Sequence, residues 1–302
     1  MTDKTTQAVA AQIEAMGCTT FEVGVFNATK ERMLTKVWDR ETIMKSVPYL
    51  KYQNMQGNHI YIRPAGAHNL TMVDDLDADK IRAMKRAGHS PALVVETSPN
   101  NFQAWLKHHK MLPTEVSTRA SKEVATLYGG DPSSADWRHY GRLAGFTNCK
   151  KKYQQPNGLY PFVVLKEASG KAYDKSAAFV AEVEAKHEAE QQADKERRAK
   201  FSHVAPSTNH HHRARKTIND FRNDPRYAGD YHRAELGFAT YAIARGVGEK
   251  EVIAAIMTRD LSHKGNAARQ DDYAERTVKK AIEITQNQPA QAQQSRDAGR
   301  SR

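Results

Sequence analysis

Residues 171–200 divide the sequence, because they contain neither Gly nor Pro and consist mainly of Ala, Glu, Lys, Gln and Arg. These residues are strong helix formers, so the segment predicts one long helix. Its first half has a weak apolar stripe (Ala178, Val180 and Val183), and its second half is polar all round. A helix that buries so little often bridges two domains. The sequence therefore predicts a domain at 1–170, a linking helix and loop at 171–205, and a second domain at 206–286.

The first zone alternates short apolar runs with helical patterns. The apolar runs predict strands at residues 20–26, 59–64, 69–76, 92–97 and 159–167, and the patterns between them predict helices at 77–88, 100–110 and 117–130. Gly88 and Gly129 stand where glycine commonly ends a helix. Such alternation is typical of an α/β or α+β domain with one principal sheet.

The C-terminal zone has the periodicity of helices. Residues 233–246, 249–261 and 272–286 predict helices joined by short turns, and so a small helix bundle. The polar segment 287–302, rich in Gln and Arg, predicts a disordered tail. Adjacent histidines on the polar loop, His210–His212, cannot all face one metal ion, so they are interpreted as loop residues.

Charge and composition narrow the class of protein. Lys and Arg number 46 against 35 Asp and Glu, and the net charge of +11 suits a polyanionic partner such as nucleic acid. Two cysteines exclude a disulfide scaffold. The sequence has neither an 18-residue apolar run nor a signal peptide, which predicts a soluble protein of a reducing compartment without membrane contact. It also has no GxxxxGK[ST] loop, so helicase activity is not expected.

The end of the predicted strand at 69–76 is acidic. An apolar run leads into Asp74 and Asp75, and Asp77 follows. Because alternate residues of a strand point the same way, Asp75 and Asp77 are expected to project from one face. Such carboxylates could hold Mg²⁺ or Mn²⁺, as in two-metal nucleotidyl transfer. The alternative is a purely structural role, in which Asp77 caps the helix that follows and holds no metal.

The next strand ends in a polar segment. Ser98 stands at a predicted helix N-cap with Pro99 at the first helical position, and such a helix end can hold a phosphate. Ordinary capping without a ligand is the alternative. Asn100, Asn101 and Gln103 add neutral hydrogen-bonding groups there.

A third segment, residues 129–153, combines an acid with bases and rings. Asp136 precedes Arg138, Arg142, Asn148 and Lys150–Lys152, and the aromatic residues Trp137, Tyr140, Phe146 and Tyr153 are interleaved with them. An acid for metal, cations for phosphates and rings for base stacking are what a polymerising site requires. A basic loop with scattered rings is the alternative.

Together these segments resemble the archaeo-eukaryotic primase superfamily, and more closely the replication primases of the RepB-prime type from IncQ-type plasmids. Residues 73–77 match the superfamily's Asp-apolar-Asp motif, and residues 98–103 match its second motif, with Gln103 in the place of a histidine. Asp136 matches the third motif. The run 142–150 resembles the basic segment of these plasmid primases, and Arg63 lies on the strand that usually precedes the acidic motif.

The resemblance implies an α+β fold: an RRM-like primase catalytic domain with a mixed sheet, followed by a long linking helix and a small helix bundle. It implies that Asp75, Asp77 and Asp136 are catalytic and hold Mg²⁺ or Mn²⁺, with Asp74 as an alternative ligand. It also implies that nucleotide and primer are bound by one group of residues: Arg63, Ser98, Asn101, Gln103, Arg142, Asn148 and Lys150.

The function implied is that of a bacterial, cytoplasmic DNA primase that makes short primers on single-stranded DNA at plasmid initiation sites. Expected partners are the single-stranded template, nucleoside triphosphates, a plasmid helicase and the host replicative polymerase. The alternative function is that of a non-catalytic replication protein that binds single-stranded or origin DNA.

Overall fold

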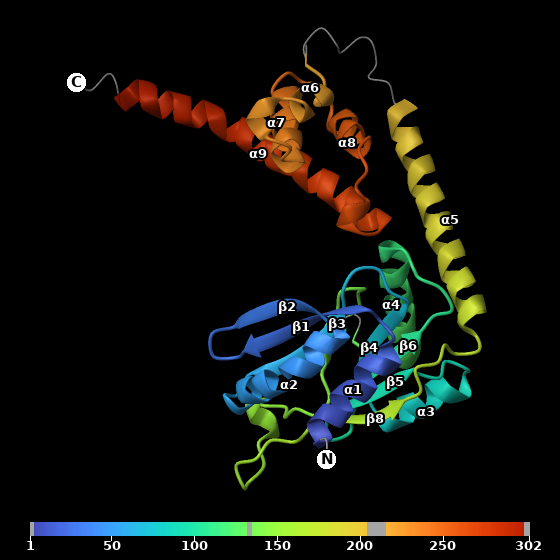
Figure 1. Cartoon of the computed structure of the whole chain (residues 1–302). Helices are drawn as coiled ribbons and strands as arrows, with labels where there is room; N and C mark the ends of the chain where they lie inside the picture. The colour runs from blue at the N-terminus through green and yellow to red at the C-terminus, as the bar shows by residue number, and fades with distance from the viewer. Residues whose placement is uncertain (1–2, 132–134, 204–215, 299–302) are drawn as a thin grey trace. The chain divides into compact units, whose positions relative to one another are not determined.

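The chain is described by a computed structural model that covers residues 3–131, 135–203 and 216–298; the side chains of 202–203 and 287–298 are not described. It divides into two units, Met1–His187 and Glu188–Arg302 (Figure 1). The division falls within helix α5 (Ser176–His203), which is the long helix predicted from residues 171–200.

The first sheet of unit 1 has the strand order β2-β1-β3-β7. Its strands are β1 (Thr20–Asn27), β2 (Arg32–Asp39), β3 (His59–Pro64) and the short β7 (Gly141–Arg142), and all its pairs are antiparallel. One face buries Phe21, Val23, Ile60 and Ile62 in a core shared with helices α1 (Lys4–Met16) and α2 (Arg40–Met55).

The second sheet has the order β4-β6-β5-β8. It comprises β4 (Leu70–Leu76), β5 (Leu93–Ser98), β6 (Asn101–Lys107) and β8 (Val164–Ala168), again with antiparallel pairs. Helices α3 (Ala78–Arg86) and α4 (Thr114–Tyr128) and the start of α5 pack on it through a second core. Gly129 ends α4 in the left-handed conformation, as predicted.

The α+β class is therefore confirmed, but the pairing differs from the expectation. Two antiparallel sheets replace one principal mixed sheet. The predicted helix at 100–110 is wrong, because residues 101–107 form strand β6. Asn100, with φ of 56°, is in the hairpin turn between β5 and β6, so the predicted helix N-terminus at Ser98 does not exist. Asn tolerates this left-handed conformation better than most residues.

Strand β6 escaped prediction because it is central. It pairs with β4 on one side and β5 on the other, and Phe102–Leu106 are buried without interruption. A strand covered on both faces shows no apolar–polar alternation, and a short run of this kind cannot be distinguished from a helix by its pattern. The edge strand β2 was not predicted either, but for a different reason. Six of its eight residues are exposed, so it shows no alternation of buried and exposed positions.

Unit 2 is the predicted helix bundle. It contains α6 (Ile218–Arg222), α7 (Tyr231–Ile243), α8 (Glu249–Met257) and α9 (Ala267–Ala298), with 3-10 turns η3 (Pro225–Tyr227) and η4 (Ser262–Lys264). Phe221, Phe238, Ile256 and Tyr273 are among the residues of its core. Helix α9 extends to Ala298, into the segment predicted to be a disordered tail. His210–His212 lie outside the described residues.

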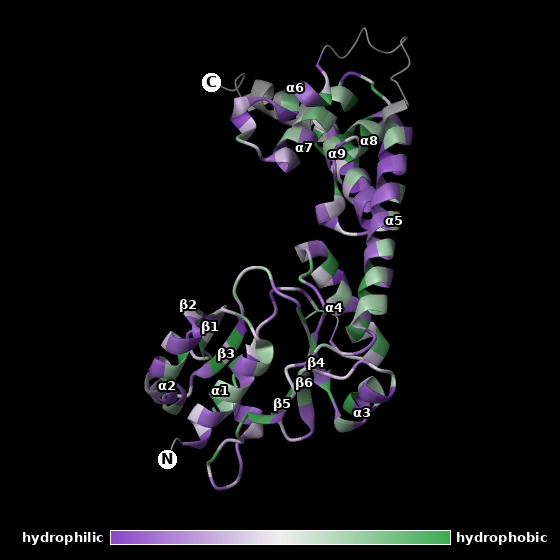
Figure 2. Cartoon of the chain, turned by 45° about the vertical axis from the view of Figure 1, so that its right-hand side comes forward, coloured by the Kyte–Doolittle hydropathy of each residue, from purple (hydrophilic) through white to green (hydrophobic). Residues whose placement is uncertain are grey.

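Helix α5 has the two-part character that its sequence predicted. Val180 and Val183 are buried in the second core of unit 1, and hydrophilic residues dominate the second half of the helix (Figure 2). Within the residues that the structure describes, no helix is both long and apolar enough to cross a membrane.

Candidate active site between the two sheets

A cavity of about 480 Å³ lies in unit 1, and its wall contains residues of both sheets. Tyr61 and Arg142 come from the first sheet, and Asp74 and Gln103 come from the second. The cavity brings together eight of the predicted site residues: Asp74, Asp75, Asn101, Gln103, Asp136, Arg142, Asn148 and Lys150. Asp77, Arg63 and Ser98 are not in its wall.

The two adjacent carboxylates are turned into the cavity by an irregularity of β4. The register against β6 shifts between Val73 and Leu76, and Asp75 has a left-handed φ of 57°. A bulge of this kind re-aims side chains and breaks the two-residue repeat of a strand. The expectation that Asp75 and Asp77 project from one face is therefore wrong, because it assumed regular alternation.

Amide side chains from β6 hold both carboxylates. Asn101 Nδ2 donates to Asp75 Oδ1 at 3.0 Å, and Gln103 Nε2 donates to Asp74 Oδ2 at 3.0 Å. Asp74 Oδ1 also accepts a hydrogen bond from the backbone N–H of Asp75 at 2.8 Å. The amides fix the direction of the acids without neutralising their charge.

Asp77 has the structural role that was the alternative reading. It is the N-cap of α3, and its Oδ1 accepts a hydrogen bond from the backbone N–H of Lys80 at 2.8 Å. It does not line the cavity, so Asp74 rather than Asp77 stands beside Asp75 in the site.

The cap predicts how Asp77 variants behave. Asp77→Ala is expected to lower the free energy of unfolding by about 1 kcal/mol, whereas Asp77→Asn retains a good cap and should leave it nearly unchanged. Thermal unfolding of both variants measures this difference. Equal stability of the two would contradict the capping role. Loss of primer synthesis in Asp77→Asn at unchanged stability would return Asp77 to the metal ligands.

Gln103 joins the two sheets at the cavity. Its Oε1 accepts the backbone N–H of Arg142 at 2.7 Å while its amide nitrogen holds Asp74, and only 3% of the residue is exposed. The neighbouring Gly141 allows this approach, since a Cβ there would lie 2.5 Å from Trp105 and 3.3 Å from Gln103 Oε1. Gln103 is therefore a positioning residue between an acid and the Arg142 backbone.

Arg142 is the buried cation of the cavity. Its guanidinium lies 4.5 Å from the centre of the Tyr61 ring and donates to Asn148 Oδ1 at 3.3 Å. Asn148 in turn donates to the Thr97 carbonyl at 2.7 Å, which again links the sheets. Burial lowers the pKa of Arg142 from its ordinary value, while the nearby Tyr61 and Asp74 oppose that shift. A guanidinium keeps its charge even so, and it can bind phosphate.

Arg63 was predicted to bind nucleotide, but it is occupied by protein groups. It pairs with Glu22 Oε2 at 2.6 Å, lies 4.2 Å from the Tyr140 ring centre and donates to the Arg138 carbonyl. Tyr140 donates to the same Glu22 oxygen at 2.7 Å. Burial alone would raise the pKa of Glu22, but these hydrogen bonds lower it. The cluster fastens the segment that carries Asp136 to the first sheet.

Other cavity residues were not among the predicted site. Met33 and Tyr61 come from strands β2 and β3, and Tyr153 comes from the 3-10 turn Lys151–Tyr153. Tyr61 could have been found, because it alternates with the buried Ile60 and Ile62 and so faces away from the core. Met33 gave no signal, since its strand has no apolar face.

The donor set fits a divalent cation. Carboxylate oxygens suit Mg²⁺ or Mn²⁺, and Mg²⁺ usually takes one or two protein carboxylates together with substrate phosphates and water. Asp74 and Asp75 supply such a pair, and Asp136 lines the same cavity. Among the described residues no three acidic, His or Cys side chains are grouped so that they could hold a metal ion together.

Comparison with known proteins identifies the family of the chain. Residues 9–190 match the family described as the RepB DNA-primase N-terminal domain. The chain belongs to this family. It is 36% identical to mobilization protein A of Escherichia coli, in a match that covers 97% of this chain and 43% of that protein. It is 27% identical to a DNA primase of Acidithiobacillus ferrooxidans, in a match that covers 54% of this chain and 47% of that protein. This RepB-family chain thus spans less than half the length of these curated relatives.

Solved structures extend the likeness to both units. A crystal structure of primase RepB′ is 34% identical, covers 97% of this chain and 99% of its own, and has a TM-score of 0.67. The catalytic domain of primase RepB′ in complex with initiator DNA is 43% identical, with a TM-score of 0.60 over 63% of this chain and 98% of its own. The predicted resemblance to RepB-prime primases is therefore confirmed.

Proposed function

We propose that this chain is a DNA primase that joins nucleotides on single-stranded DNA at a plasmid initiation site. The observation that carries the proposal is the cavity whose wall contains Asp74 and Asp75 together with buried and exposed cations. Carboxylates for a metal and cations for phosphates are the two requirements of nucleotidyl transfer. Family membership and the relative solved with initiator DNA support the same reading.

Each group has a distinct task in this proposal. Arg142 holds a triphosphate oxygen from within the wall, and Lys150 and Lys152 bind phosphates at its rim. Tyr61 and Tyr153 offer ring faces for a base or a sugar. Gln103 and Asn101 keep the carboxylates directed into the cavity. The site would hold the primer hydroxyl in line with the triphosphate, and this orientation supplies much of the rate enhancement.

The proposed cofactor is Mg²⁺ or Mn²⁺, held by Asp74 and Asp75 with Asp136 near. When bound, the ion would lower the pKa of the attacking hydroxyl and neutralise charge on the triphosphate. The proposed partners are single-stranded DNA, nucleoside triphosphates, a plasmid helicase and the host replicative polymerase, and the proposed location is the bacterial cytoplasm.

Labelled-nucleotide incorporation on an unprimed single-stranded circle that carries a candidate initiation site tests the function. We expect short products with Mg²⁺ or Mn²⁺ and none with EDTA, because the ion would lower the pKa of the attacking hydroxyl and neutralise charge on the triphosphate. Tight DNA binding without any product would favour the non-catalytic binding protein. Degradation of the circle without added triphosphates would indicate a nuclease instead.

A further inference from the structure

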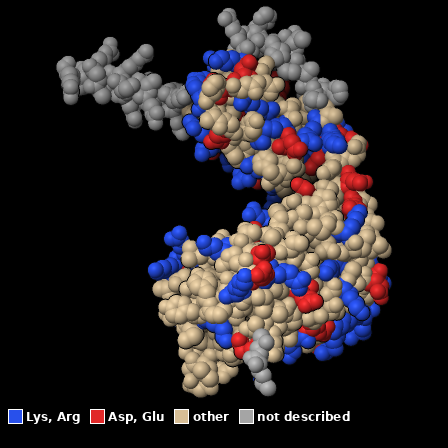
Figure 3. All heavy atoms as spheres, in the orientation of Figure 1, with Lys and Arg blue, Asp and Glu red and all other residues tan. Residues whose placement is uncertain are grey.

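Unit 2 has a groove of its own, of about 570 Å³, formed by α7, η4 and the first half of α9. Six of its wall residues are basic: His232, Arg233, Lys264, Arg269, Arg276 and Lys280. Among the described residues of the wall the one acid is Asp272, and it is paired with Arg276 at 2.7 Å. The groove is therefore strongly positive, although acids are frequent elsewhere in this unit. Figure 3 shows both signs of charge on the visible face of unit 2.

The positive charge is not explained by the packing of the bundle. Arg222 and Arg259 pair with the buried Glu235, and Arg197 pairs with Asp271. In contrast, no carboxylate among the described side chains pairs with Arg233, Arg269 or Lys280. Converging like charges repel one another, so a surface that gathers them without counter-ions is suited to an anion.

The cations form a row along α9. Arg269, Arg276 and Lys280 are spaced by seven and four residues, which places them on one face of a helix. At 1.5 Å per residue, Arg269 and Lys280 are about 16 Å apart along the axis. Lys264 adds a charge beside this row, with its Nζ 4.6 Å from the centre of the Tyr273 ring and 2.5 Å from His232 Nε2.

We propose that this groove binds the phosphate backbone of single-stranded DNA, independently of the cavity in unit 1. An extended row of separate cations matches successive phosphates of a strand better than it matches one compact triphosphate. Most of its wall residues are basic side chains, which contact phosphates and not base edges, so the groove is expected to bind without reading base sequence. The inference deepens the proposed function, because it gives the template strand a second point of attachment.

A pair of charge-matched double variants of the whole chain tests the proposal. Arg269→Glu with Lys280→Glu reverses two groove charges, and Lys250→Glu with Lys279→Glu reverses two exposed charges outside the groove wall. The dissociation constant of a fluorescent oligothymidylate, which contains no initiation site, is measured over a series of salt concentrations. Thermal unfolding verifies that both proteins are folded.

The groove variant is expected to bind at least about tenfold more weakly than the control. The slope of log binding constant against log salt concentration should be smaller in magnitude by about 1.4, for two lost phosphate contacts. Equal constants and slopes for the two variants would overturn the proposal. Weaker binding of labelled nucleoside triphosphate alone, with oligothymidylate binding unchanged, would overturn it too and assign the groove to nucleotides.

The outcome is separable from that of the primase proposal. An Asp75→Asn protein is used in the same measurement, and its groove-dependent binding is expected to equal that of the unchanged chain. If the chain makes no primers but the groove variant still loses oligothymidylate binding, the primase proposal fails and the groove stands. If primers are made and the groove variant binds as its control does, the groove proposal alone fails.

Discussion

Asp75→Asn is expected to reduce primer synthesis at least about a hundredfold, the loss typical when a preorganised charge of a polar active site is removed. The substitution keeps the shape of the side chain and removes the negative charge next to Asp74 in the cavity. Because Asp75 is exposed and, within the part of the chain that the structure describes, its side chain hydrogen-bonds only Asn101, the fold and DNA binding should change little. Nucleotide incorporation and oligonucleotide binding measure the two properties separately.

Asp79→Asn is the matched control for this variant. Asp79 lies four residues along the chain at the start of α3, pairs with Arg82 and is not in the cavity wall. It carries the same charge change and should retain synthesis. Equal losses in both variants would mean that the net charge of this region, rather than a metal site, determines the rate. Full synthesis in Asp75→Asn would remove the acid pair from the proposed chemistry.

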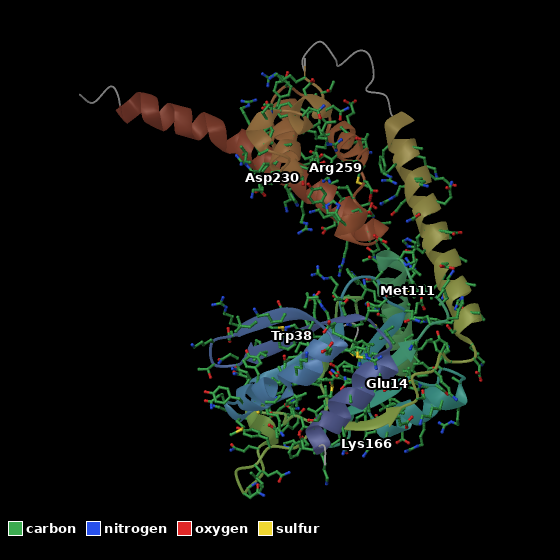
Figure 4. All side chains as sticks on the ribbon, in the orientation of Figure 1. Glu14, Trp38, Met111, Lys166, Asp230 and Arg259 are labelled. Carbon is green, nitrogen blue, oxygen red and sulfur yellow. The ribbon has the colours of Figure 1, made fainter. Side chains whose placement is uncertain are left out.

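Glu235→Ala is expected to lower the free energy of unfolding of unit 2 by about 3–5 kcal/mol, the usual loss when one partner of a buried ion pair is removed. The Glu235 side chain is fully buried and receives Arg222 at 2.8 Å, Arg259 at 2.8 Å and the Tyr273 hydroxyl at 2.6 Å. Figure 4 labels Arg259 within the bundle. Without the carboxylate, two guanidinium groups remain partly buried with no counter-charge.

The same cluster gives unit 2 a pH dependence. Burial alone would raise the pKa of Glu235, but the hydrogen bonds from Arg259, Tyr273 and Arg222 leave it below its ordinary value of 4.5. A carboxyl whose pKa is lowered by folding stabilises above its unfolded pKa and loses that contribution as the pH falls through the folded value. The thermal unfolding midpoint of unit 2 should therefore decrease as the pH is lowered below 4.5. Glu235→Gln should weaken this pH dependence.

Asp272→Ala provides the control for Glu235→Ala. It breaks an exposed pair with Arg276 on the same unit, and such pairs typically contribute about 0.3–0.5 kcal/mol. Circular dichroism over a thermal or urea gradient compares the two variants. A loss for Glu235→Ala as small as that for Asp272→Ala would show that the arginines find water or another acid when Glu235 is removed.

The amino-acid sequence by itself determined the order of the parts. The helix-forming composition of residues 171–200, the apolar runs of β1, β3, β4 and β5, and the periodicity of the C-terminal zone are local properties, and each gave the element that the structure contains. The chemistry of the site was also local in part, since acids after a strand and a basic aromatic segment are visible in the sequence. Asp74, Asp75, Asp136 and Arg142 were found on that basis.

The tertiary structure decided which of these residues meet. Residues 101–107 form strand β6 because β4 and β5 pair with their backbone hydrogen-bonding groups on both sides. The sequence of residues 101–107 does not by itself specify these partners. Because of the bulge in β4, Asp74 and not Asp77 lies beside Asp75 in the cavity wall. Arg63 pairs with Glu22 and lies outside that wall. Side-chain direction depends on register and on partners distant in the chain, whereas helix and strand patterns are written in adjacent residues.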